Sequence, residues 1–441
     1  MPPMTTAQTL ALAPETAASL HPADLAALLS RRPAEAGWAI MSTLPLTRRA
    51  EAFGYLDPAL QLGMARAAPP RDFAALVTAM DADERADLWA RLGPEAQEAL
   101  LPALAAAERE DIRRLAAYPA GTAGAVMTSE YAVLRGELTA RDAIETLRGQ
   151  AHSKETIHVA YVLSPQRRLL GTVTLEDLVL APAGRLVEAL MRRDPPTVHA
   201  QDKAEEAARA IARYDLPAIP VINGGEMMVG IITADDAMDV AEAEATDDFH
   251  KAGGSNSLGV SMLNATVGLL YRKRISWLVV LVFANLFSGA GIAAFEDVIA
   301  ANVALVFFLP LLIDSGGNAG SQSATLMVRA LATGEARMGD WARMLRREVT
   351  VAALLGLTMA GAVSLLGLVR GGPEIAVVVA LTMVCVVLVG SVIGLSLPFL
   401  LSRLKVDPAT ASAPLITSIA DASGVLIYFG IASALLVNPT T

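Results

Sequence analysis

Cysteine, histidine and charged residues are all scarce in this chain of 441 residues. It contains one cysteine, Cys385, and five histidines. A disulfide framework and a cysteine-cluster metal site are therefore excluded, and a zinc enzyme is disfavoured. Charged residues make up 18% of the sequence, against about 25% in an ordinary soluble protein. A net charge of −10 argues against a nucleic-acid partner, and a hydrophobic content of 54% excludes a disordered chain or a collagen-like fibre.

The charge that is present is unevenly distributed. Residues 1–271 hold 24 basic and 36 acidic residues, whereas residues 272–441 hold 11 basic and 9 acidic residues. The first part is therefore soluble and acidic, and the second is apolar. Because residues 1–15 lack a basic start and a continuous apolar stretch, we expect no signal peptide and a cytosolic N-terminal part.

The apolar part contains five hydrophobic segments: residues 275–295, a segment from residue 298 that is interrupted at 314–317, and residues 349–369, 375–401 and 409–437. About 20 apolar residues are needed to cross a bilayer as a helix, so five spans are predicted. Basic residues gather before the first span, between the second and third, and between the fourth and fifth. The positive-inside rule then predicts a multi-pass protein of the cell (inner) membrane with a cytoplasmic N-terminus and a C-terminus outside.

The acidic part contains a repeat. Residues 170–177 (LGTVTLED) and 229–236 (VGIITADD) both read as a strand, a threonine and an acidic helix start, which is a capping pattern. Each copy begins at a methionine (Met127, Met191) and continues as strand, amphipathic helix and strand. Before the repeat, residues 21–118 have helical periodicity punctuated by prolines, which predicts a stack of short helices.

Carboxylates occur at two unusual places. Seven lie between residues 235 and 248, where they form either a solvated acidic face or a sensor for hard divalent cations. Asp421 lies about 12 residues into the last span, where a charge costs at least about 2.5–3.5 kcal/mol. We interpret it as part of an ion pathway, the alternative being a protonated or locally bonded acid at a helix contact. The glycine-rich interruption at 314–323 predicts a broken span that lines water or packs against protein.

Several of these strings carry a family resemblance. Residues 316–325 (GGNAGSQSAT) with 329–332 (RALA), and residues 406–409 (VDPA) with 418–428 (SIADASGVLIY), resemble the MgtE magnesium channels. The repeat resembles a tandem pair of CBS domains. The order of parts also agrees: residues 1–20 as a disordered N-terminus, 21–118 as an α-helical superhelical domain, 119–241 as the α/β CBS pair, 242–270 as a connecting "plug" helix, and 271–441 as a five-helix transmembrane pore domain.

The resemblance implies a homodimer in the lipid bilayer whose pore lies on the dimer axis between the second and fifth spans. The pore residues that it implies are Asp421, Asp314, Gly317, Ser321 and Thr417, of which Asp314 and Ser321 depart from the family pattern. The ligands implied for transported and regulatory Mg²⁺ are Asp421, Glu205, Asp215, Asp236, Asp239, Glu244, Asp247, Asp248, Asp83, Asp87 and Asp407. The family's CBS pair can bind ATP, here through Asp177 and Asp236, although Glu176 beside Asp177 disfavours a polyphosphate.

The function predicted is a Mg²⁺-selective, Mg²⁺-gated channel for magnesium uptake that cytosolic Mg²⁺ closes. One alternative is a CBS-regulated transporter of another divalent cation such as Mn²⁺ or Co²⁺. A CBS-regulated anion or solute transporter would present basic groups to its substrate, and an enzyme would need a nucleophile–base pair or a metal triad that the sequence does not reveal.

Overall fold

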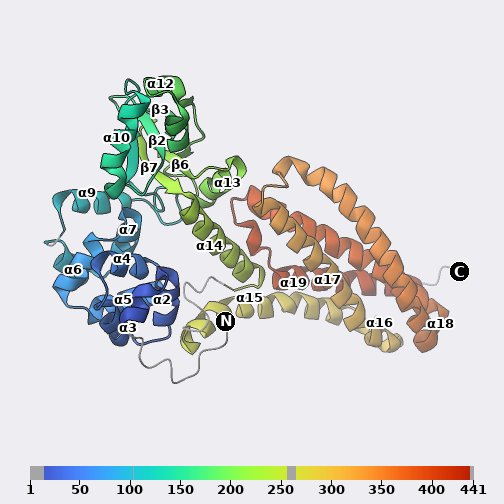
Figure 1. Ribbon diagram of the computed structural model, residues 1–441. Helices are drawn as coiled ribbons and strands as arrows, with labels where there is room; N and C mark the ends of the chain where they lie inside the picture. Colours follow the sequence, from blue (N-terminus) through green and yellow to red (C-terminus); the bar gives the residue numbers. More distant parts are fainter. Residues whose placement is uncertain (1–13, 103, 256–264, 438–441) are drawn as a thin grey trace. The chain divides into compact units, whose positions relative to one another are not determined.

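The computed structural model describes residues 14–102, 104–255 and 265–437. The chain divides into two units, residues 1–244 and 245–441 (Figure 1). The boundary falls inside a single helix, α14, Ala234–Ala252. The segment expected as a separate plug helix from residue 242 is therefore the continuation of a helix that begins in the CBS region.

Short helices build the first part of the N-terminal unit. Five of them begin on a proline, at Pro14, Pro22, Pro58, Pro70 and Pro94, where the missing N–H has no helical partner to lose. Their bounds are α1 Pro14–Ser19, α2 Pro22–Leu29, α3 Ala34–Met41, α4 Leu46–Gly54, α5 Pro58–Ala67, α6 Pro70–Thr78, α7 Ala82–Arg91, α8 Pro94–Leu100 and α9 Ala106–Leu115. Disorder was expected up to residue 20; α1 is helical from Pro14, and residues 1–13 lie outside the described residues.

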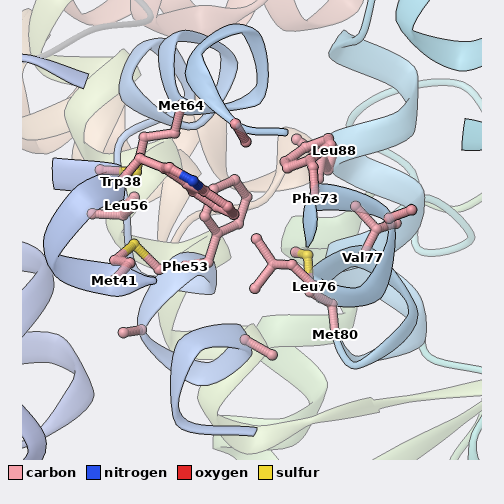
Figure 2. Packing of buried hydrophobic residues seen from close by; sticks show 14 of the residues in the cluster. Trp38, Met41, Phe53, Leu56, Met64, Phe73, Leu76, Val77, Met80 and Leu88 are labelled. Atoms are coloured by element: carbon pink, nitrogen blue, oxygen red, sulfur yellow. The ribbon is translucent and has the colours of Figure 1, made fainter. Parts of the chain in front are cut away.

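Large apolar side chains fill the space between these helices. Trp38 and Phe53 both meet Phe73 edge to face, with ring centroids 6.4 and 6.0 Å apart, and Figure 2 shows the cluster around them. Inside it, the Gln61 side chain donates a 2.9 Å hydrogen bond to the Phe53 carbonyl, which satisfies a buried amide. The helix α7, which carries several carboxylates, packs against this core.

Two small sheets follow, one for each repeat. The first is ordered β1-β2-β3-β4 and the second β5-β6-β7. In each, the first pair of strands is parallel and the next antiparallel, so the repeat in sequence is a repeat in topology. The bounds are β1 Tyr131–Leu134, α10 Ala140–Gln150, η1 Ala151–Ser153, β2 Thr156–Leu163, β3 Leu169–Thr174, α11 Leu175–Leu180, α12 Val187–Leu190, β4 Arg192–Arg193, β5 Val198–His199, α13 Ala204–Tyr214, β6 Ala218–Ile222 and β7 Met228–Thr233.

The two sheets exchange their opening segments. Arg192, at the opening of the second copy, pairs with β3 of the first, and Thr128, at the opening of the first copy, pairs with β7 of the second. The crossing is close: a Cβ at Gly171 would lie 2.6 Å from the Arg192 carbonyl oxygen, and one at Gly230 would lie 2.7 Å from that of Thr128. The glycine of each repeat is therefore required where the other copy's segment passes.

Long apolar helices make up the C-terminal unit. Their bounds are α15 Val267–Ala294, α16 Glu296–Ala301, α17 Ala304–Ala332, η2 Met338–Asp340, α18 Trp341–Arg403, η3 Pro408–Thr410, α19 Ala413–Ala432 and the π-helical turn η4 Ser433–Val437. Among the described residues, four helices are long and apolar enough to cross a membrane. Most of the large apolar side chains of α15 are exposed, for example Leu286 at 63% and Phe287 at 75%. Such exposure is what contact with lipid requires.

The helix α18 is two spans joined at a sharp break. Its 63 residues would extend about 95 Å as one rod, far more than a bilayer's thickness. Gly372 has a φ of 83° and a ψ of −176°, which interrupt the helix. Gly356 lies against Val384 and Gly367 against Ala376, so the two halves run back along each other. The unit thus carries the five spans that the sequence predicts.

The prediction that the second span is interrupted, in contrast, is wrong. The helix α17 runs without a break through the glycine-rich string 316–323. The glycines instead bring backbones together: a Cβ at Gly390 would lie 2.2 Å from the Gly316 carbonyl oxygen, and one at Gly394 would lie 2.0 Å from that of Gly320. Two glycines four residues apart on each helix form this contact, the small-residue packing that membrane helices use.

Candidate functional site

An open groove in the C-terminal unit brings two acidic side chains together. Asp421 comes from the middle of α19 and Asp314 from α17, and the groove that they share is otherwise apolar, with Phe307, Leu309, Pro310, Leu311 and Ile313 as its walls. The Asp314 carboxylate accepts a 3.0 Å hydrogen bond from the Asn318 side chain, one turn further along α17. Among the described residues, neither carboxylate forms an ion pair with a basic side chain. Such a groove attracts positive charge.

Gly317 positions α17 against Asp421. A Cβ at Gly317 would lie 3.5 Å from Oδ1 of Asp421 and 3.1 Å from the Thr417 methyl carbon, so glycine lets the helices approach at the height of the acid. The Thr417 hydroxyl donates a 3.0 Å hydrogen bond to the Pro414 carbonyl. Ser321 lies one turn beyond Gly317, and its hydroxyl is buried without a protein partner among the described residues. The candidate pore residues thus lie along one stretch of α17 and α19.

A second acidic site lies in the N-terminal unit, between α7 and the start of α14. Burial, and then the neighbouring Asp236, raise the pKa of Asp83 to about 7. Burial raises the pKa of Asp236, and the hydrogen bond from the Thr233 side chain lowers it. Burial is the larger effect, and the pKa rises to about 6. Oδ1 of Asp83 is buried without a hydrogen-bond partner among the described residues. The two acids are far apart in the sequence, on α7 and α14, and their proximity disfavours the charged form of both.

Three further acids belong to this site and were missed by sequence reasoning. Burial, and then Asp83, raise the pKa of Glu84 to about 8; burial, and then Asp81 and Asp83, raise that of Glu155 to about 8. Asp81 itself has a raised pKa because of burial. The string Asp81-Ala-Asp-Glu is visible in the sequence, but Glu155 follows η1 as an isolated acid, and no local pattern marks it.

The other predicted ligands of the N-terminal unit are spread out. Asp87 pairs with Arg91 at 2.7 Å and Glu205 with Arg209 at 3.0 Å. Asp215 ends α13 in a left-handed conformation, with a φ of 51°, and its side chain is exposed. Asp239 lies on the exposed face of α14, where burial and the neighbouring Glu242 raise its pKa. Glu244 lies further along α14, half-buried. Asp248, also half-buried, follows in the part of α14 that belongs to the C-terminal unit.

The helix-capping interpretation holds for both CBS aspartates. The Thr174 hydroxyl donates a 2.6 Å hydrogen bond to Asp177, whose own backbone N–H donates back to Thr174. The Thr233 hydroxyl donates in the same way to Asp236, at 2.5 Å. Each carboxylate therefore has a structural partner, which any contact with a nucleotide would have to share.

The predicted ligands Asp247 and Asp407 meet a lysine. Lys251 forms ion pairs with both carboxylates, with Asp247 one turn earlier on α14 and with Asp407 at the start of η3. More generally, no group of three or more His, Cys, Asp and Glu side chains in the described part of this single chain is gathered to hold one metal ion.

Three regions of the chain match known families. Residues 309–431 match MgtE, described as a divalent cation transporter; residues 20–121 match the MgtE intracellular N domain; and residues 123–184 and 187–243 each match the CBS domain. The predicted fold class, a helical domain, a CBS pair and a helical membrane region, is confirmed.

Similar proteins cover almost the whole chain. The magnesium transporter MgtE of Thermus thermophilus is 35% identical over 427 residues, 96% of this chain and 94% of that protein. The magnesium transporter MgtE of Bacillus subtilis is 32% identical over 418 residues, 95% and 92% of the two chains. A crystal structure of the cytosolic domain of the Mg²⁺ channel MgtE in complex with ATP is 30% identical, covers 52% of this chain and 93% of that one, and has a TM-score of 0.50.

Both curated relatives are transporters and not enzymes, and the apolar helices make this chain a multi-pass membrane protein. Identity above 30% over nearly the full length of these relatives carries more weight than any single motif. The chain belongs to the MgtE family of divalent cation transporters.

Proposed function

We propose that this protein is a Mg²⁺-selective channel that takes magnesium into the cell and is closed by cytosolic Mg²⁺. The observation that carries the proposal is the position of Asp421, a carboxylate halfway along a membrane helix that faces a groove instead of a basic partner. An acid in a membrane span is costly unless it meets water or a cation. The N-terminal unit is then cytoplasmic and the C-terminus is outside.

Transport follows from the chemistry of the groove. Mg²⁺ gives up its water shell reluctantly, so it binds carboxylates while it keeps several waters. Asp314 lies one turn from Gly317 toward the start of α17, so an ion arriving from outside meets Asp314 before Asp421. The membrane potential drives the ion inward with about 2.3 kcal/mol per charge per 100 mV.

Gating is assigned to the acidic site around Asp83 and Asp236. These acids are buried close together, which is unfavourable without a counter-ion and favourable with one. A divalent cation that binds only the arrangement in which they are close shifts the population toward it. High cytosolic Mg²⁺ therefore favours one conformation, which we take to be the closed one.

The functional unit that we propose is a homodimer. One chain presents a groove with a single Asp421, and no three-acid ligand group is complete within its described residues. A second copy across a twofold axis would add a second Asp421 and close the groove into a pore. Cross-linking of the purified protein in lipid, read as the mass of the product, tests this.

The central test is Mg²⁺ flux into proteoliposomes. Asp421→Ala is expected to abolish flux, because the ion loses a carboxylate that lines the groove. The matched control is Asp297→Ala, which removes an exposed acid from α16, the short helix before α17, and is expected to leave flux unchanged. Undiminished flux in Asp421→Ala would remove the pore assignment.

Two measurements separate the neighbouring possibilities. Competition of Mg²⁺ flux by Mn²⁺ and Co²⁺ decides which divalent cation is the main substrate. Isothermal titration of ATP into residues 120–250 decides whether this CBS pair binds the nucleotide that the solved relative holds.

A further inference from the structure

The end of α14 is tied to the membrane domain by one lysine. The Lys251 ammonium pairs with Asp247 on its own helix and with Asp407 at the start of η3, 156 residues further along. All three side chains lie in the C-terminal unit. A lysine side chain is protonated at physiological pH, so an ammonium faces both carboxylates.

The Asp407 carboxylate is held at both of its oxygens. Oδ1 accepts a 2.9 Å hydrogen bond from the backbone N–H of Ala409, which caps η3, and Oδ2 accepts from Lys251. The family resemblance assigned Asp247 and Asp407 to a regulatory Mg²⁺. In this chain a side-chain cation already lies between them, so these two residues do not form a vacant divalent site.

A second contact fixes the same helix end. Gly254 has a φ of 71° and caps α14, its N–H donating to the Lys251 carbonyl at 2.8 Å. A Cβ at Gly254 would lie 2.6 Å from the indole nitrogen of Trp277 on α15 and 3.4 Å from Pro414 at the start of α19. The Trp277 indole nitrogen is buried. The end of α14 is thus packed against α15 and the start of α19, and the ion pairs are part of a joint.

We propose that Lys251 is a built-in counter-ion that takes the place of a divalent cation at this joint and holds the plug helix against the pore domain without Mg²⁺. The inference rests on the proposed gating function. Since the joint needs no bound ion, Mg²⁺ has only to act on the acidic site of the N-terminal unit. Without the ammonium, Asp247 and Asp407 repel each other, and a divalent cation is needed to bridge them.

The test measures Mg²⁺ closure in inside-out patches from membranes that contain the full-length protein. Lys251→Met is expected to raise the Mg²⁺ concentration for half-closure by about threefold, the scale of a partly exposed ion pair. It is also expected to enlarge the rise in melting temperature that Mg²⁺ produces in detergent. Lys251→Arg, which keeps the charge, is expected to behave as the wild type in both measurements.

Two further variants guard against a general charge or folding effect. Lys405→Asn removes an exposed positive charge from the same loop at a position with a φ of 59°, which asparagine tolerates, and is expected to change neither measurement. Asp407→Asn keeps an oxygen for the η3 cap and loses the ion pair to Lys251. It should raise the half-closure concentration as Lys251→Met does, but without enlarging the Mg²⁺-dependent rise in melting temperature, because only Asp247 remains charged and it keeps its lysine partner.

The outcomes separate the inference from the proposed function. If Lys251→Met closes at the wild-type Mg²⁺ concentration and Mg²⁺ stabilises it as much as the wild type, Lys251 does not replace a divalent cation at this joint. A wild-type protein that conducts no Mg²⁺ would overturn the proposed function, and the thermal measurement would still decide whether Lys251 replaces an ion.

Discussion

At the scale of single residues, two acids on one helix have opposite roles. Asp83 and Asp87 lie one turn apart on α7, yet Asp87 pairs with Arg91, whereas Asp83 is buried beside Asp236 with an unpartnered oxygen. Two aspartates four positions apart therefore differ in their contribution to stability. A paired, half-exposed acid contributes little to stability, and a buried, unpaired acid is destabilising unless a cation or proton neutralises it.

This difference predicts opposite results for two conservative substitutions. Asp83→Asn is expected to stabilise the cation-free protein at pH 7.5 by about 2 kcal/mol, because a buried charge is removed, and to reduce its stabilisation by Mg²⁺. Asp87→Asn is the matched control, with an expected loss of about 0.5 kcal/mol or less. Thermal unfolding with and without Mg²⁺ measures both, and a destabilised Asp83→Asn would contradict the assignment.

At the scale of elements, glycine pairs decide how the membrane helices pack. Gly316 and Gly320 of α17 face Gly390 and Gly394 of α18, and the neighbouring Gly317 faces α19. One helix thus uses adjacent glycines for two contacts, and the second of these brings Asp421 to the groove. The position of Asp421 depends on close helix packing, which any side chain larger than the hydrogen of glycine would prevent.

Gly390→Ala tests this contact with a single added methyl group. Its Cβ would lie 2.2 Å from a backbone oxygen that cannot rotate away, so we expect a loss of about 1–3 kcal/mol and reduced flux. Gly361→Ala is the control on the same helix, because nothing lies within 4 Å of its added Cβ; it should be neutral or stabilise the helix by up to about 1 kcal/mol. Melting temperature in detergent and Mg²⁺ flux are the measurements, and equal values for the two variants would refute the packing role.

At the scale of the whole molecule, negative charge is concentrated in the part that the membrane does not hold. Residues 1–271 carry 12 more acidic than basic residues, with 36 against 24. Several of these acids are raised in pKa by burial, Asp236 to about 6, Asp83 to about 7 and Glu155 to about 8. The N-terminal unit is therefore expected to respond to protons and to divalent cations through the same groups.

The sign of the pH effect follows from these raised values. The unfolded chain has lost these protons above about pH 4.3, whereas the folded unit keeps them until pH 6–8. The stability that the protonated acids confer is complete below the unfolded pKa and is lost as pH rises through the folded pKa.

We therefore expect cation-free residues 1–252 to melt roughly 5 °C lower at pH 8 than at pH 5.5. Added Mg²⁺ should restore more stability at pH 8 than at pH 5.5, because only charged acids bind it. Calorimetry with EDTA and with Mg²⁺ at the two pH values provides the comparison. A melting temperature that rises with pH in EDTA would contradict the burial of these acids.

Local patterns were enough to predict the parts of this protein. The five apolar segments, the repeated strand–threonine–acid motif and the proline-punctuated helices are properties of neighbouring residues, which a span, a capping box and a helix start require directly. The prediction that Asp421 belongs to an ion pathway also came from the sequence alone, because a charge in an apolar run is costly wherever the helices pack.

Only the tertiary structure decided what these parts do to one another. It turned the predicted break in the second span into a continuous helix with a glycine contact, added Glu155 to the site of Asp83 and Asp236, and placed Lys251 between Asp247 and Asp407. Each involves residues from distant parts of the chain. The physical reason is that burial, repulsion and ion pairing depend on distances across space, which the order of residues along a chain does not set.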